Sequence, residues 1–579
     1  MISSRDQYVS AAKVADVATA GRLVVQLNGH VIALFAHAGR IYAVDNRCPH
    51  MGFPLHRGTL KDGILTCHWH HARFDLASGG TFDQFADDVR IFPVQIRDGE
   101  VWVDLTPPVD PHLHQRDRLR DGLERDIPLV IAKAVLTLVD ATDGHEAPVR
   151  MGLEYGARYR QAGWGQGLTI LTCMSNVLPH LEGDDRARAL YHGLSAVARE
   201  CAGAPPRFEL RPLPTTTTDF PTLVRWFRQF IEVRDAEGAE RCVVSAIRSG
   251  ADATHMAEML FAAATDHRYI DIGHPLDFTN KAFEALETVG WSLAELVLTS
   301  LTTSYANADR MEESNEWRNP VDLVALEETA FEQLPGALEA GRNRRGPWAG
   351  RESLISVLLG EDPQAIADAL LAALHEGCPE VDLAAIVAYG AALRLARFHT
   401  SNEFSDWDTA LHTFTFANAV QQGLRRTPSP ALLRGVFDGA MSIYLDRFLN
   451  IPPAPTPELT RQSANPDELL GELRVLLDRQ QQVNEAGTLV FHYLSAGGDP
   501  RRLLTTLGSL MIREDRNFHT IQVIEAAFRQ FSLLRGTPEG VQTMVAAARY
   551  LGAHAPTMRA QGQTFHIASR LHRGDRLYA

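Results

Sequence analysis

The sequence predicts a multidomain chain in which a small all-β domain is followed by a large all-α domain. Three observations support this. The length of 579 residues is too great for a single hydrophobic core. Apolar and polar residues alternate over residues 22–44, which is the period of short antiparallel strands. From about residue 129 onward the apolar residues recur instead at intervals of three and four, which is the period of amphipathic helices.

The β domain is expected over residues 1–106. Its first strands fall within residues 22–44, with a turn at Asn28-Gly29 and another at Gly39. Two loops rich in Cys, His and Gly follow over residues 48–80, and alternation returns at 89–94 and 100–104 around Asp98-Gly99. Residues 107–128 contain proline and dense charge, so we expect a linker or a short connecting helix there.

The two loops carry paired metal-ligand motifs. Cys48 and His50 form a CxH motif, and after sixteen intervening residues Cys67 and His70 form a CxxH motif. Each loop thus offers one thiolate and one imidazole. Four such ligands suit zinc or an iron–sulfur cluster, because both require these donors held close together.

Residues 8–105 resemble the Rieske family of 2Fe-2S proteins, in the form found in ring-hydroxylating oxygenases, their ferredoxins and nitrite reductase small subunits. The likeness extends beyond the ligands, to Gly52, Leu55, Gly58-Thr59-Leu60, Asp62-Gly63, Phe74-Asp75, Ser78-Gly79 and the closing segment FPVQIRDGEVWV. It implies a Rieske 2Fe-2S cluster as cofactor, with Cys48 and Cys67 on the buried iron and His50 and His70 on the outer iron. A zinc site with the same four ligands is the alternative interpretation.

The second loop departs from the family at two positions. His68 and His71 stand where such families often have Pro and Gly. They leave the register of the loop open, although only His70 completes the CxxH motif.

The resemblance also implies what the cluster does. Two neutral imidazoles in place of two thiolates raise the reduction potential above that of an all-cysteine ferredoxin, and the site transfers one electron at a time. Neither loop has the extra cysteine of high-potential respiratory Rieske proteins, so the chain resembles the lower-potential oxygenase type. An external electron-donating reductase or ferredoxin is the implied redox partner.

The all-α domain is expected over residues 129–579. Amphipathic segments occur throughout it, and Asp or Ser often precedes a segment as a helix N-cap. Examples are residues 183–203, 254–266, 292–313, 362–377, 381–398 and 467–493. The standard catalytic half of a Rieske oxygenase holds a mononuclear iron with two His and one carboxylate on a mainly β scaffold, and this helical periodicity contradicts that fold.

Three clusters of acids and histidines are the candidate catalytic residues of the helical domain. They supply His267, Asp271 and His274; His399, Glu403, Asp408 and His412; and His519 and Glu525. Helical bundles build iron and manganese sites from inward-facing side chains of these types, and Asp408 with His412 stands at the i,i+4 spacing of one helix face. We therefore expect an additional non-haem iron or manganese. Helix caps and solvated ion pairs are the simpler explanation of the same residues.

Composition limits the partners. A net charge of −15 with no compensating basic run argues against nucleic acid. No stretch reaches the roughly 18 apolar residues of a membrane span, and residues 1–23 lack the apolar core of a signal peptide. Four further cysteines are scattered without paired spacing, as in a reducing compartment. We expect a cytoplasmic protein.

The function that fits these features is that of an oxidoreductase. The cluster would relay single electrons to an oxygenase-like helical domain that acts on a small-molecule substrate. The alternative is an electron-transfer protein whose helical domain only docks a partner or forms a homo-oligomer.

Overall fold

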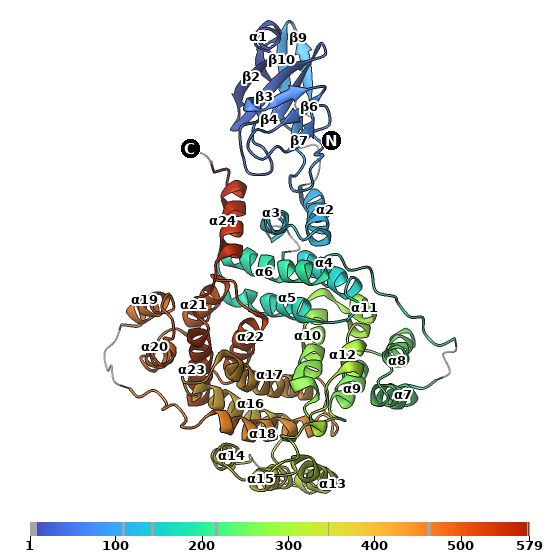
Figure 1. Cartoon of the computed structure of the whole chain (residues 1–579), viewed down its shortest axis with the longest axis vertical. Helices are drawn as coiled ribbons and strands as arrows, with labels where there is room; N and C mark the ends of the chain where they lie inside the picture. Colours follow the sequence, from blue (N-terminus) through green and yellow to red (C-terminus); the bar gives the residue numbers. More distant parts are fainter. Residues whose placement is uncertain are drawn as a thin grey trace. The chain divides into compact units, whose positions relative to one another are not determined.

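The computed structural model describes residues 8–106, 111–139, 144–214, 218–344, 347–459, 465–575 and 577. The chain forms two compact units (Figure 1). The first comprises Met1–Pro148 and Ala560–Ala579, and the second comprises Val149–Arg559. A small antiparallel β fold followed by a large helical region is the architecture expected from the sequence.

The β part of the first unit consists of three antiparallel sheets. The strands are β1 (Tyr8–Lys13), β2 (Arg22–Leu27), β3 (His30–His37), β4 (Arg40–Asp45), β5 (Thr59–Lys61), β6 (Ile64–Thr66), β7 (Arg73–Asp75), β8 (Ile91–Phe92), β9 (Val94–Arg97) and β10 (Glu100–Asp104). They pair in the orders β1-β10-β9, β2-β3-β4-β8 and β5-β6-β7. A short helix, α1 (Val14–Ala20), follows β1.

Two apolar clusters hold these strands together. One contains Ile32, Leu34 and Val101, all fully buried. The other surrounds Phe74 and Leu65 and includes the two cysteines of the ligand loops. The cysteines of the ligand loops are thus buried in an apolar cluster distinct from the first.

Three helices complete the first unit. These are α2 (Pro111–Glu124), α3 (Pro128–Val139) and α24 (Ala560–His572), and α3 packs against both of the others. Residues 107–110 of the expected linker lie outside the described residues, and residues 111–124 form α2. The compact units therefore divide the chain differently from the expected boundary near residue 129, because apolar residues of α3 such as Ile131 and Val135 are buried within the first unit.

The second unit is helical throughout its described residues. Its helices are α4 (Glu146–Arg158), whose start overlaps the boundary, α5 (Gln166–Val177), α6 (Asp184–Cys201), α7 (Phe220–Glu232), α8 (Ala236–Arg248), α9 (Ala253–Ala264), α10 (His274–Val289), α11 (Ala294–Thr299), α12 (Thr302–Asn307), α13 (Leu323–Arg342), α14 (Arg351–Leu358), α15 (Pro363–His375), α16 (Glu380–Ala396), α17 (Phe404–Arg426), α18 (Arg434–Asp446), α19 (Pro466–Leu476), α20 (Val483–Ser495), α21 (Pro500–Ile512), α22 (Phe518–Leu533) and α23 (Pro538–Ala553).

The helices α10, α17 and α22 lie in the middle of this unit (Figure 1). The helix α17 packs against both of the others, and α5 packs against α10 and α22. Nearly every residue of α17 between Ala410 and Leu424 is buried. Such a helix, buried on most of its faces, places polar side chains inside the unit, where they need partners or ligands.

Among the described residues, none of the helices combines the length and the hydropathy needed to cross a bilayer.

Candidate metal centres

Two loops of the β unit bring four metal-ligand side chains to one place. The first follows β4 and the second connects β6 to β7. Each loop is closed by a backbone hydrogen bond from its cysteine to the residue five positions later: Cys48 N to Phe53 O at 2.8 Å, and Cys67 N to Ala72 O at 2.9 Å. The two loops therefore have matching closures that present a cysteine and a histidine each.

The cysteines lie inside and the histidines lie outside. Cys48 and Cys67 are 3% and 1% exposed. Their thiols are close enough to hydrogen-bond, which lowers the pKa of Cys67 to about 6 and raises that of Cys48. The rings of His50 and His70 meet edge to face with centroids 4.8 Å apart, and His70 is exposed.

The four side chains fit a Rieske cluster as its ligands. Nδ1 of His50 is buried and has no hydrogen-bond partner among the described residues. Such an atom is costly unless it binds something, and a metal is the partner that an unprotonated imidazole nitrogen prefers. His68 is engaged elsewhere, because its Nε2 lies 2.6 Å from Thr59 Oγ1. The ring paired with His50 is therefore that of His70.

The comparison with known families agrees with this geometry. The Rieske [2Fe-2S] domain family matches residues 7–93. The ferredoxin component of the naphthalene 1,2-dioxygenase/salicylate 5-hydroxylase systems of Ralstonia sp is 30% identical over 99 residues, which are 17% of this chain and 95% of that protein.

The chain belongs to the Rieske [2Fe-2S] family.

Two other relatives show how widely the Rieske domain is shared. The ferredoxin component of the p-cumate 2,3-dioxygenase system of Pseudomonas putida is 32% identical over 93 residues, covering 16% of this chain and 79% of that protein. The oxygenase subunit of 3-chlorobenzoate-3,4-dioxygenase from Comamonas testosteroni is 30% identical over 110 residues, covering 17% of this chain and 26% of that protein. The helical part of the chain matches no family.

A lysine from outside the matched segment reaches the Rieske domain. Nζ of Lys133, on α3, donates hydrogen bonds to the backbone oxygens of Pro49 and His50, each at 2.5 Å. Burial lowers the pKa of Lys133 to about 8, and the negative charge of Asp87 opposes that shift. Asp87 is paired in turn with Arg118 of α2, with Nε to Oδ1 at 3.2 Å. A buried cationic group thus lies against the first ligand loop.

The helical unit contains a second group of possible metal ligands. His274 begins α10, His412 lies in the middle of α17, and His519 lies at the start of α22. One ring nitrogen from each lies within 4.8 Å of the other two. Nε2 of His412 and Nε2 of His519 are 3.0 Å apart. Two imidazoles bound to one metal at about 2.1 Å and at right angles would have their nitrogens about 3.0 Å apart.

A carboxylate orients one of these rings. Nδ1 of His519 lies 3.2 Å from Oδ2 of Asp408, and the hydroxyl of Tyr550 donates to Oδ1 of Asp408 at 2.5 Å. A ligand histidine in proteins usually gives its second N–H to a carboxylate, which fixes the tautomer and leaves the other nitrogen free for the metal. Asp408 therefore acts on His519 and stands one turn from His412 without being a direct ligand.

Two of the rings at this site, those of His274 and His412, are held in their neutral form. Burial lowers the pKa of His274 to about 4, with the charge of His519 adding to the effect. Burial also lowers the pKa of His412 well below its ordinary value. Neutral imidazoles are the form that binds metal.

A strained turn places His274. Tyr269, Asp271 and Ile272 have φ of 41°, 44° and 47°, and Gly273 has φ of 92°. A Cβ atom on Gly273 would lie 2.9 Å from Cβ of Phe416 on α17. Non-glycine residues seldom adopt such angles, and a run of them is found where a function requires a special backbone.

The other five expected catalytic residues lie away from the three histidines or are engaged elsewhere. His267 is paired with Glu312, Nδ1 to Oε1 at 2.6 Å, and Glu525 is paired with the buried Lys281. His399 lies 2.7 Å from the hydroxyl of Ser401, and Glu403 caps α17. Asp271, in the strained turn, has its backbone N–H bound to Asp309 O at 2.6 Å.

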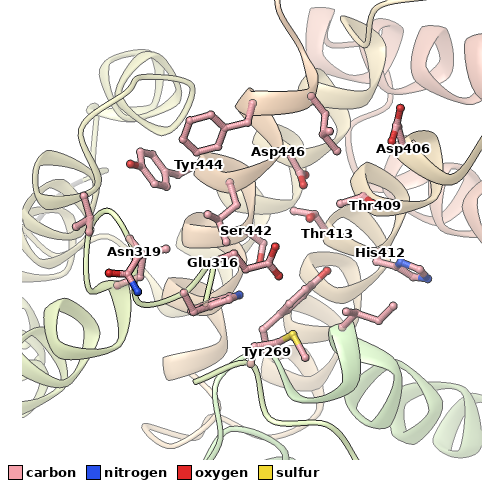
Figure 2. A pocket seen from close by; sticks show the side chains of 18 of the residues that line it. Tyr269, Glu316, Asn319, Asp406, Thr409, His412, Thr413, Ser442, Tyr444 and Asp446 are labelled. Atoms are coloured by element: carbon pink, nitrogen blue, oxygen red, sulfur yellow. The ribbon is translucent and has the colours of Figure 1, made fainter. Parts of the chain in front are cut away.

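A cavity of about 430 Å³ has His412, one of the three histidines, in its wall (Figure 2). It is also lined by Tyr269, Trp317, Ser442 and Asp446. None of these four, nor Tyr550 or Lys133, was singled out from the sequence. Ser442 and Asp446 stand one turn apart on α18, but the other residues come from separate helices and loops, so no local spacing could reveal the set.

Proposed function

We propose that this chain is an oxidoreductase in which the Rieske domain supplies single electrons to a metal bound by His274, His412 and His519, and that this metal uses oxygen on a small-molecule substrate. The convergence of the three histidines is the observation that carries the proposal. They come from three helices far apart in the sequence, and one ring nitrogen from each lies within 4.8 Å of the other two, which supports binding of all three to one ion after small side-chain movements.

The chemistry of the site supports a metal that reacts with an external molecule. Three nitrogen ligands leave coordination positions free, and imidazole donors suit iron among several metals. Asp408 holds His519 in the tautomer that frees Nε2. His412 also borders the cavity, so a molecule bound there would lie next to the metal.

The relatives support the electron-transfer part of the proposal. The first relatives are named as ferredoxin components of dioxygenase systems, and another is an oxygenase subunit. By analogy, an external reductase would reduce the Rieske domain of this chain. The substrate is proposed to be a small organic molecule, as those names imply for their own systems.

Metal analysis of the purified full chain tests the proposal. We expect iron or manganese beyond the two irons of the Rieske cluster, and His412→Ala should remove the excess while the visible spectrum of the cluster stays. His399→Ala is the matched control, because His399 is bound to Ser401. Two irons per chain in all three proteins would favour the alternative, a helical unit for docking or oligomerisation. Zinc at the three histidines would exclude the redox role, because zinc does not change oxidation state.

A further inference from the structure

The cavity beside His412 has an apolar wall that combines aromatic and aliphatic side chains. Trp317 is 1% exposed, and its ring stacks on that of Tyr269 with centroids 6.1 Å apart. Tyr444 and Phe448 line the cavity from another side. A volume of about 430 Å³ is within the range of pockets that enclose a molecule of two or more rings.

Five polar groups gather at one part of this wall. Figure 2 shows the side chains of Tyr269, Glu316, Thr413, Ser442 and Asp446 directed toward the same region of the cavity, with His412 at its edge. Tyr269 is 7% exposed and Asp446 is 3% exposed. The Tyr269 hydroxyl and Oδ2 of Asp446 make no hydrogen bond of good geometry with the described residues, although the hydroxyl of Thr413 is near both and that of Ser442 is near Tyr269.

Unpartnered polar atoms at this depth need an explanation. Leaving a buried donor or acceptor unsatisfied is unfavourable, so two of them on one wall of a cavity indicate a ligand that completes their hydrogen bonds.

The charge around the cavity restricts that ligand. Burial raises the pKa of Asp446 to about 7, against the opposing effects of Thr413 and Arg394. The remaining acids of the lining are Glu316 and Asp406, and His412 is its only basic residue among the described lining residues. A carboxylate ligand would meet these acids, whereas a neutral oxygen group can both accept from and donate to a protonated Asp446.

We infer that Asp446 and Tyr269 bind the hydroxyl or carbonyl oxygen of an uncharged aromatic molecule, which the cavity holds with its ring system beside His412. The inference rests on the proposed function only for the reaction that the bound molecule undergoes. The binding itself does not depend on a metal. Asp446 and Tyr269 thereby select the substrate by its neutral oxygen group.

Binding to the full chain, measured by calorimetry, tests the inference. The probes share one ring system: 4-hydroxybiphenyl, biphenyl, biphenyl-4-carboxylate and 4-(aminomethyl)biphenyl. We expect 4-hydroxybiphenyl to bind most tightly. Tyr269→Phe removes only a hydroxyl and should weaken this probe about 2- to 12-fold, the range for one neutral hydrogen bond. Biphenyl should bind equally well to the variant and the original protein.

Asp446 is tested by a pair of variants. Asp446→Asn keeps a donor and an acceptor, so the preference for 4-hydroxybiphenyl over biphenyl should persist. Asp446→Leu removes both and should abolish the preference. Tighter binding of the carboxylate or of the ammonium probe would overturn the inference, and so would the absence of binding by any probe. The metal content is measured separately, so failure here is distinguishable from failure of the proposed function.

Discussion

Nζ of Lys133 lies 2.5 Å from the backbone oxygen of His50, a candidate ligand residue of the Rieske domain. Lys133 belongs to α3, outside the segment that matches the Rieske family. A cation held at this point favours the more negative, reduced state of the cluster, because opposite charges attract more strongly away from water.

Lys133→Met should lower the reduction potential of the cluster. Charges several ångströms apart at an effective dielectric constant of about 20 interact by about 1–2 kcal/mol, which corresponds to about 40–90 mV for one electron. Redox titration followed by visible absorption measures the shift. Lys133→Arg retains the positive charge, so its reduction potential should stay close to that of the original protein. Lys13→Met, which removes an exposed lysine of β1, should leave the reduction potential unchanged. Equal potentials in Lys133→Met and the original protein would contradict the role of this charge.

His70→Ala should abolish the cluster, whereas His68→Ala should retain it. The ring of His70 meets that of His50, while His68 is bound to Thr59. Iron content and the visible spectrum of the purified variants decide between the two histidines. Loss of the cluster in His68→Ala alone would reverse the assignment of the ligand.

Asp408→Asn should weaken metal binding at the three histidines about 10- to 100-fold, the usual effect of losing a group that orients a ligand. The physical reason is that the amide can no longer fix His519 as the carboxylate does. Equilibrium dialysis against the metal measures the affinity. Asp368→Asn, the same change at an exposed position of α15, is the control and should have no effect.

Gly273→Ala should displace His274 and lower both stability and metal content. The added methyl group would collide with Phe416, and the backbone at φ of 92° is unfavourable for alanine. We expect a loss of about 1–3 kcal/mol in the free energy of unfolding. Gly250→Ala separates the two causes, because Gly250 has φ of 94° with nothing within 4 Å of the added Cβ. Retention of the metal in Gly273→Ala would show that this turn does not position His274.

The stability of the helical unit should depend on pH through Asp446. Its pKa is raised from the ordinary value of 3.8 to about 7 in the folded state, chiefly by burial. Between these values the folded chain keeps a proton that the unfolded chain has released. The free energy of unfolding therefore falls as the pH rises toward 7, and levels off above it.

Asp446→Asn removes this dependence. From pH 5 to pH 8, the free energy of unfolding of the original protein should fall by about 2–3 kcal/mol relative to that of the variant. Urea unfolding of the full chain at the two pH values measures the difference, with Asp368→Asn as the exposed control. A constant difference at both pH values would show that Asp446 does not bind its proton more tightly in the folded state.

The sequence by itself determined the architecture and supplied the candidate cluster ligands. The period of the apolar residues distinguishes strands from helices locally. The candidate ligands of the Rieske domain lie within 23 consecutive residues, 48–70, so their spacing along the chain is visible in the sequence. The choice of His70 over His68 came from the structure, in which His68 is bound to Thr59 on the neighbouring strand.

Only the tertiary structure decided which residues form the second candidate site. The sequence predicts Asp408 and His412 as a pair of metal ligands, and it offers His399 and Glu525 as further candidate catalytic residues. Packing of α10, α17 and α22 brings His274, His412 and His519 together, and Asp408 turns out to hold His519 instead. The physical reason is distance along the chain: helix packing joins residues more than 100 positions apart, and no local pattern records which helix faces meet.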